Sequence, residues 1–159
     1  MALALWQLAF LIFPGIALLH LHISPYTKVE ESFNIQAIHD ILEYGVPLSK
    51  ATTKFEQYFD HLEFPGAVPR TFIGSLWISG LASPVVWLAE LTGKSAQNCV
   101  RGVLGVFNAT ALAWFARSVE RAYGPIVATW YVVLQAAQFH VWYYASRTLP
   151  NMFAFFLST

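Results

Sequence analysis

The sequence contains little charge. Of its 159 residues, 11% are charged, and nine lysines and arginines balance nine aspartates and glutamates. Soluble domains average about 25% charged residues, so the composition excludes an ordinary soluble domain. A formal net charge of zero also leaves no basic footprint for nucleic acid, and we expect no nucleic-acid partner.

Cysteine and metal-ligand patterns are scarce as well. Cys99 is the one cysteine, which excludes an intramolecular disulfide framework. The five histidines do not fall into H-E-x-x-H or another ligand spacing. We therefore expect neither a metal ion nor a cofactor.

Hydrophobic residues, by contrast, are abundant. They make up 57% of the chain, 16% is aromatic, and six residues are tryptophan. This profile is typical of a membrane protein with several helices and aromatic belts at the two interfaces. We predict an all-α, polytopic membrane protein.

The first apolar run is expected to form a membrane helix over residues 3–21, because residues 2–21 contain no charge. A signal peptide is the alternative. It is disfavoured because no lysine or arginine precedes Lys28 and no small-residue cleavage pattern follows the run.

Further apolar runs follow in the second half of the chain. We expect membrane helices at 100–116 and 123–145, a broken segment at 72–91, and the start of another membrane helix at 150–159. Ser83-Pro84 interrupts the segment 72–91, which either crosses the membrane or is re-entrant or interfacial. A membrane helix needs about 20 residues, so the short final run suggests the N-terminal part of a longer protein.

Residues 22–71 form the main polar segment and contain more acidic than basic residues. This excess argues against a cytoplasmic loop, so we place the segment on the lumenal side. Residues 28–44 read as an amphipathic helix at the membrane interface. Thr27 and Glu30 match a capping box at its start, and Gly45 is expected to end it.

Two adjacent carboxylates, Glu30 and Glu31, begin this helix. Neighbours on a helix point about 100° apart, so one carboxylate can face a substrate while the other orients or caps. The alternative is structural: Glu30 in the capping box and Glu31 as a solvated acid of the first turn.

Two other groups are candidates for a site. Asp60, His61, Glu63 and Arg70 belong to a polar loop that either lines an acceptor site or is plain surface. Arg147 offers a planar fork suited to phosphate, with snorkelling at a helix end as the alternative. Asn108-Ala109-Thr110 matches a glycosylation sequon within an apolar run, and we expect it to be unmodified.

Three segments in this order resemble the ER dolichyl-phosphate-mannose-dependent mannosyltransferase family, of the GT-C class. They are 27–37 (TKVEESFNIQA), 58–72 (YFDHLEFPGAVPRTF) and 146–151 (SRTLPN). The resemblance implies an N-terminal part of a GT-C-type fold, with a lumenal loop carrying interfacial helices, in a multi-pass ER membrane protein. It also implies inverting alpha-1,6-mannosyl transfer from dolichyl-phosphate-mannose to a lipid-linked oligosaccharide.

The resemblance also assigns roles to residues. The family's acidic pair, in a His-Pro-Asp-Glu pattern, maps the catalytic base onto Glu30 and Glu31, with Lys28, Val29 and Glu30 replacing His, Pro and Asp. Donor-phosphate binding maps onto Arg147, Thr148 and Asn151, with Pro150 replacing a serine. The implied partners are dolichol-linked donor and acceptor lipids and membrane lipids, and the oligomeric state stays open. A transporter fragment and a non-catalytic membrane fragment or assembly partner are the competing hypotheses.

Overall fold

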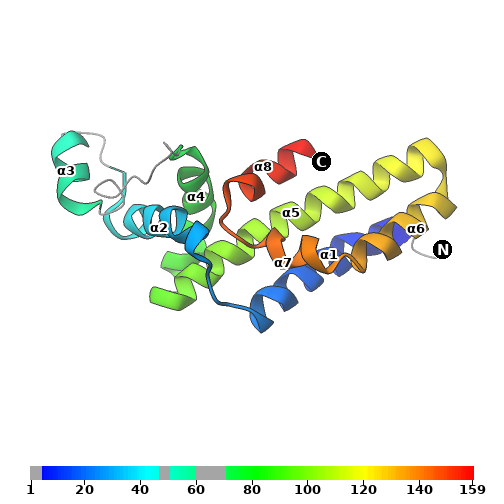
Figure 1. Cartoon of the computed structure of the whole chain (residues 1–159), viewed down its shortest axis with the longest axis horizontal. Helices are drawn as coiled ribbons and strands as arrows, with labels where there is room; N and C mark the ends of the chain where they lie inside the picture. The colour runs from blue at the N-terminus through cyan, green and yellow to red at the C-terminus, as the bar shows by residue number, and fades with distance from the viewer. Residues whose placement is uncertain (1–4, 47–50, 60–70) are drawn as a thin grey trace. The chain divides into compact units, whose positions relative to one another are not determined.

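The computed structural model describes residues 5–46, 51–59 and 71–159, and these residues form helices and no strand. The all-α prediction is therefore confirmed. In chain order the elements are α1 (Leu5–Ile23), η1 (Val29–Glu31), α2 (Ser32–Tyr44), α3 (Ala51–Tyr58), α4 (Ile73–Leu88), α5 (Gly93–Tyr123), α6 (Pro125–Ala136), α7 (Phe139–Ala145) and α8 (Pro150–Ser158) (Figure 1). The chain divides into two compact units, residues 1–26 with 101–159 and residues 27–100.

The core of the first unit lies among α1, α5, α6 and α7. On α1, Ala9, Phe13 and Ala17 recur every four residues and are fully buried, so they form one face of the helix. Small residues on such a face let neighbouring helices approach closely. Helices α6 and α7 both pack against α1, and Figure 1 shows α6 running alongside it. The buried residues of this core are Ala9, Phe13, Ala17, Ala109, Leu112, Ala113, Ala116, Val132, Trp142 and Ala145.

Helix α5 is longer than the expected 100–116 segment. It has 31 residues, and the stretch 116–122, which we expected to link two helices, is helical. The chain turns instead at Gly124, whose φ of 87° favours glycine, and Pro125 then occupies the first turn of α6. The Gly124 amide closes the end of α5 by donating to the Glu120 carbonyl at 2.8 Å.

The run 123–145, expected as one helix, contains two. Helix α6 ends at Ala136 and α7 begins at Phe139. The Trp142 indole N–H donates to the carbonyls of Gln135 and Ala136, at 2.9 and 3.0 Å. The indole thereby satisfies two carbonyls near the end of α6, and its burial holds α7 against the core.

In the second unit, α2 packs against α4. Helix α4 continues through Ser83-Pro84, where we expected a break. Pro84 has no amide hydrogen to donate to Gly80, and the Ser83 hydroxyl donates to the Gly80 carbonyl instead, at 3.1 Å. The serine therefore supplies the hydrogen bond that the proline removes, and the helix is not interrupted.

Helix α3 lies in the polar segment 22–71, outside the one helix that we expected there, over residues 28–44. Its aromatic residues pack in pairs, with ring centroids 4.7 Å apart for Phe55 and Phe59 and 5.2 Å apart for Tyr44 and Tyr58. Phe59 is 2% exposed and also lies against Phe72. The aromatic contacts fix α3 against the end of α2, which terminates at Gly45 as predicted.

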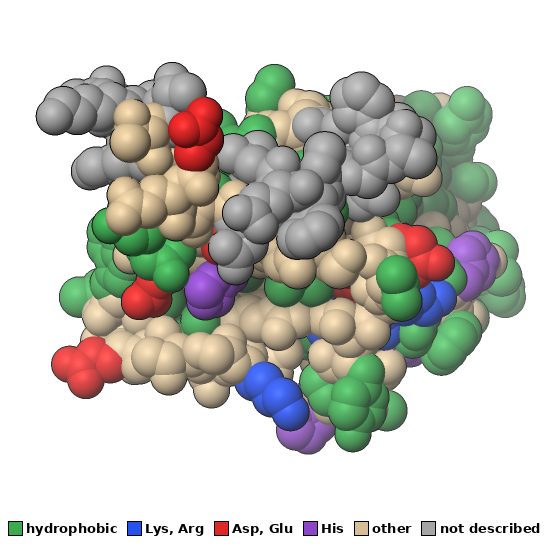
Figure 2. Space-filling model, turned by 60° about the vertical axis from the view of Figure 1, so that its left-hand side comes forward, with side chains coloured by type: hydrophobic (Ala, Val, Ile, Leu, Met, Phe, Trp, Pro, Cys, Tyr) green, Lys and Arg blue, Asp and Glu red, His purple; other side chains and the backbone are tan. Residues whose placement is uncertain are grey.

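Two of the described helices, α1 (over Trp6–Ile23) and α5, are long and apolar enough to cross a membrane; α4 and α6 are apolar but shorter. Helix α6 exposes a stripe of large apolar side chains, with Ile126 73%, Trp130 61% and Leu134 60% exposed. Figure 2 shows one face of the molecule, on which exposed hydrophobic side chains lie beside a few charged ones. Apolar stripes on these helices suit a lipid environment.

Candidate functional site

The acidic pair begins the helical part of the second unit. Glu31 is fully buried, whereas Glu30 is exposed. The Lys28 amide donates to Oε1 of Glu31 at 3.1 Å, so the acid that reaches back to the helix start is Glu31. The expected capping by Thr27 and Glu30 is thus shifted by one residue, and Glu31 is not a solvated acid of the first turn.

The buried face of η1 and α2 also carries amide and acid groups. Asn34 and Asp40 are each 4% exposed, and Asp40 lies 3.3 Å from the Nδ1 of His39. On α4, Ser75 and Ser79 are buried one helical turn apart, and their hydroxyls contact no hydrogen-bond partner among the described residues. The second unit therefore contains buried polar groups in addition to an apolar core.

Arg147 lies in the first unit, in the loop between α7 and α8. Its side chain is 1% exposed, so it does not snorkel at the surface. One guanidinium nitrogen donates to the Tyr26 carbonyl at 2.5 Å, and the other donates to the Ser24 hydroxyl at 3.3 Å. The guanidinium also stacks over the ring of Tyr143, 4.4 Å from its centroid. Arg147 therefore holds the segment that leads along the chain into the acidic pair.

The other two predicted phosphate ligands differ in exposure. Thr148 is fully buried, and Asn151 is exposed on the first turn of α8. The acidic pair and the Arg147 motif belong to different units. The predicted pairing of a Glu30 or Glu31 carboxylate with the Arg147 guanidinium therefore remains a proposal.

Arg101 is a buried arginine that the sequence interpretation missed. It is 1% exposed, and Nη1 donates to the Pro25 carbonyl at 2.6 Å while Nε donates to the Ser146 carbonyl at 3.3 Å. Its sequence position is at the second residue of the apolar run 100–116. The available signal was its position, because an ionisable residue in a membrane-type helix is itself a reason to expect a function.

Two further α5 residues contact the Arg147 loop. A Cβ added to Gly105 would lie 3.1 Å from the Cβ of Ser146, so glycine permits the close approach. Asn108 is fully buried and donates from Nδ2 to the carbonyls of Ala145 and Met152, at 2.8 and 3.1 Å. The amide of the expected non-glycosylated sequon thus serves a structural role.

The remaining candidates, Asp60, His61, Glu63 and Arg70, lie outside the described residues. Within residues 5–46, 51–59 and 71–159, no group of three or more His, Cys, Asp or Glu side chains is arranged to hold a metal ion.

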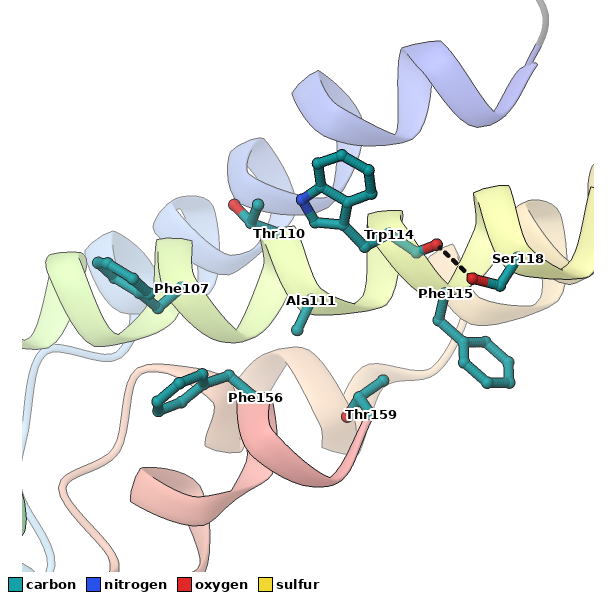
Figure 3. A pocket seen from close by; sticks show the side chains of 8 residues that line it. All are labelled: Phe107, Thr110, Ala111, Trp114, Phe115, Ser118, Phe156 and Thr159. Carbon is teal, nitrogen blue, oxygen red and sulfur yellow. Dashed lines mark hydrogen bonds between the residues drawn. The ribbon is translucent and has the colours of Figure 1, made fainter.

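A groove of about 340 Å³ lies between α5 and α8 in the first unit (Figure 3). Its lining residues are Phe107, Thr110, Ala111, Trp114, Phe115, Ser118, Phe156 and Thr159. The hydroxyls of Thr110, Ser118 and Thr159 each donate to the carbonyl four residues earlier in the chain. Its lining therefore carries no charge, and its three hydroxyl protons are already engaged by backbone carbonyls.

Comparison with known proteins gives a consistent assignment. The model of the Alg9-like mannosyltransferase family matches residues 7–159. Similar relatives are proteins of Arabidopsis thaliana (40% identical over 147 residues, 91% of this chain), Saccharomyces cerevisiae (37% over 156, 83%) and Drosophila melanogaster (44% over 140, 85%). Each of the three is named Dol-P-Man:Man(7)GlcNAc(2)-PP-Dol alpha-1,6-mannosyltransferase. No solved structure matches the chain.

The match covers most of this chain but a minor part of its relatives. The chain spans 28%, 27% and 19% of the plant, yeast and fly proteins, respectively. The matched residues contain both the acidic pair and the Arg147 motif. The chain belongs to the Alg9-like mannosyltransferase family.

Proposed function

We propose that the protein carrying this chain transfers mannose from dolichyl-phosphate-mannose to a lipid-linked oligosaccharide, forming an alpha-1,6 linkage in N-glycan precursor assembly. The observation that carries this proposal is the match to relatives named for that reaction, at 37–44% identity over most of the chain. Dolichol-linked lipids are accordingly the proposed donor and acceptor. The proposed location is the endoplasmic reticulum membrane, with several crossings and the site facing the lumen.

The proposed reaction needs a proton acceptor. The acceptor hydroxyl attacks the anomeric carbon of the donor mannose, the bond from that carbon to the phosphate oxygen breaks, and configuration inverts. A carboxylate takes the hydroxyl proton, and dolichyl phosphate departs with the bonding electrons. Because phosphate is already a good leaving group, a general acid is not essential. General-base assistance of this kind contributes typically about 10²–10⁴-fold.

Glu30 is the proposed base and Glu31 the residue that orients it. Glu30 is exposed and can approach a substrate, whereas the Glu31 carboxylate is buried and accepts the Lys28 amide at the helix start. Adjacent helical residues cannot face one target together, which is consistent with two different roles.

Arg147 is the proposed electrostatic partner of the donor phosphate. A buried guanidinium acts in a medium of low polarity, where it stabilises developing negative charge more strongly than in water. Its hydrogen bonds to Ser24 and Tyr26 tie this charge to the segment that precedes the acidic pair. Thr148 and Asn151 flank it in the same motif and complete the proposed phosphate site.

The test uses a chimera in which this chain replaces the matching segment of the Saccharomyces cerevisiae relative. Membranes from cells lacking the native yeast protein are given dolichyl-phosphate-mannose and a lipid-linked Man(7) acceptor. We expect one mannose to be added in alpha-1,6 linkage. A second chimera carrying the Arabidopsis segment controls for the junctions. If that control transfers mannose and the chimera with this chain, present in equal amount, does not, the proposal is overturned.

A further inference from the structure

We propose that Arg101 is a positioning residue for the mannosyl transfer, and that it sets the Arg147 loop against the segment leading to the acidic pair. The inference rests on the proposed function and deepens it, because it adds a residue to the same site. Arg101 lies near the start of the part of α5 that belongs to the first unit.

The first argument is the bonding of its guanidinium. One edge donates to the Pro25 carbonyl at 2.6 Å, and Nε donates to the Ser146 carbonyl at 3.3 Å. These acceptors lie 76 and 45 residues away along the chain. Pro25 precedes the acidic pair by a few residues, and Ser146 directly precedes Arg147. A single side chain therefore connects, within the first unit, the residue-25 segment that precedes the acidic pair in the chain with the loop that carries the proposed phosphate ligand.

The second argument is that Arg147 holds the same segment from its own side. Arg101 binds the Pro25 carbonyl, and Arg147 binds the next carbonyl, that of Tyr26. Two guanidinium groups thus fix consecutive carbonyls of one short connection. Moving either arginine would shift the segment and, through it, the other arginine.

The third argument is the rest of the α5 surface. Gly105, one turn after Arg101, allows Ser146 to approach closely, and Asn108, nearly one turn further, binds the Ala145 and Met152 carbonyls. Together, Arg101, Gly105 and Asn108 form a stripe that holds the loop on both sides of Arg147. A loop held this firmly suits a charge that must be placed to within a fraction of an ångström.

The chemistry of arginine explains why a charge is buried here. Burying a guanidinium is costly, and an apolar residue of similar size would often stabilise a core as well. The planar guanidinium, however, donates in two fixed directions at once, which the single ammonium of lysine does not reproduce. Arg101→Lys therefore tests the role of this geometry, because lysine keeps the positive charge but cannot donate in two fixed directions at once.

In the chimera, we expect Arg101→Lys to lower kcat/KM for dolichyl-phosphate-mannose roughly tenfold per molecule of folded enzyme, since a small misplacement of a reacting group is enough to slow catalysis. Folded enzyme is quantified as the monodisperse fraction after extraction in detergent. Arg117→Lys is the matched control on the same helix: Arg117 lies against Trp6 and Trp114, away from the loop, and its kcat/KM should not change.

A double-mutant cycle separates positioning from a merely structural role. If Arg101 acts through Arg147, the double variant Arg101→Lys/Arg147→Lys is no less active than Arg147→Lys alone. Independent losses that multiply, or a loss seen only in the amount of folded protein, overturn the inference and leave the proposed function intact. If the unaltered chimera fails to transfer mannose while the Arabidopsis chimera succeeds, the proposed function is overturned, and this inference with it.

Discussion

The exposures of Glu30 and Glu31 are opposite, although the two residues are adjacent in the sequence. A general base must come within hydrogen-bond reach of the proton that it removes. Glu30, the proposed base, is exposed and accessible to a substrate, whereas the Glu31 carboxylate is buried and accepts the Lys28 amide. The two glutamates therefore have different proposed roles because their surroundings differ.

Glutamine substitutions test this division of roles. In the chimera, Glu30→Gln removes the base with little change of shape, and we expect transfer to fall by about 10²–10⁴-fold. Glu31→Gln keeps an acceptor oxygen for the Lys28 amide, because glutamine also serves in a capping box. Its transfer rate should therefore fall far less than that of Glu30→Gln.

Both variants are compared by initial rates of mannose transfer in membranes that contain equal amounts of enzyme. A reversed order of activities would make Glu31 the base. Near-normal activity of both variants would remove the acidic pair from the mechanism altogether.

At the scale of elements, the break between α6 and α7 shows how one side chain shapes the first unit. The buried Trp142 donates its indole N–H to the Gln135 and Ala136 carbonyls. Its ring also packs on Phe13 of α1, with centroids 4.9 Å apart. Trp142 thus joins the two halves of the interrupted run and fixes them to the first helix.

Trp142→Phe should destabilise the protein, because it retains an aromatic ring but removes the indole donor from the Ala136 carbonyl and leaves the Gln135 carbonyl with the Gln138 amide. We expect the free energy of unfolding to fall by about 1–3 kcal/mol. Trp130→Phe is the matched control: Trp130 is 61% exposed on α6, and its replacement should change stability by less than about 0.5 kcal/mol.

The measurement is unfolding of the detergent-solubilised protein by sodium dodecyl sulfate, followed by far-ultraviolet circular dichroism. Equal midpoints for the two phenylalanine variants would show that the indole hydrogen bonds do not stabilise the connection between α6 and α7.

Hydrophobic pattern predicts the existence of these helices better than their ends. The apolar runs correctly indicated the all-α class, and Gly45 correctly ended α2. The end of α5 was wrong because residues 116–122 carry charges and were taken as a link, whereas Gly124-Pro125 is the stronger signal for a turn. Helix α3 was missed because its large apolar residues, Phe55 and Tyr58, pack on rings outside the helix, Phe59 and Tyr44, and no helical periodicity reveals such contacts.

For the site, too, the sequence predicted some features and missed others. The sequence and its resemblance singled out Glu30, Glu31 and Arg147, but not the exposure of each side chain. Arg101 was missed because its acceptors are backbone carbonyls far away in the chain, which no local spacing reveals. Contacts of that kind depend on how α5 and the α7–α8 loop pack together.

At the scale of the whole molecule, the first unit constrains the topology of the chain. Arg101 binds both Pro25 and Ser146, so the end of α1, the Arg101 region of α5 and the end of α7 meet at one end of that unit. From there α5 runs out to Gly124, and α6 and α7 return (Figure 1). If this hairpin crosses the membrane, both of its open ends lie on the same side as Ser24–Tyr26.

This arrangement determines whether α4 crosses. Between Tyr26 and Arg101 the chain must cross the membrane an even number of times, and α4 is the apolar helix that the structure describes in that interval. Its 16 residues span about 24 Å, less than the roughly 30 Å of a hydrocarbon core. We therefore predict that α4 does not cross. With the acidic pair on the lumenal side, as proposed, Arg117 and Arg121 near the far end of α5 would lie in the cytosol, in agreement with the positive-inside rule.

Single cysteines placed in a Cys99→Ala background test this topology in sealed microsomes whose cytosolic face is outside. Tyr26→Cys and Lys94→Cys should react with a membrane-impermeant thiol reagent only after permeabilisation, and Arg121→Cys should react without it. All three side chains are exposed, so access depends on the side of the membrane. If α4 crosses, Lys94→Cys and Arg121→Cys exchange their behaviour while Tyr26→Cys does not. Arg147 would then lie on the side opposite Tyr26, which its hydrogen bond to the Tyr26 carbonyl forbids.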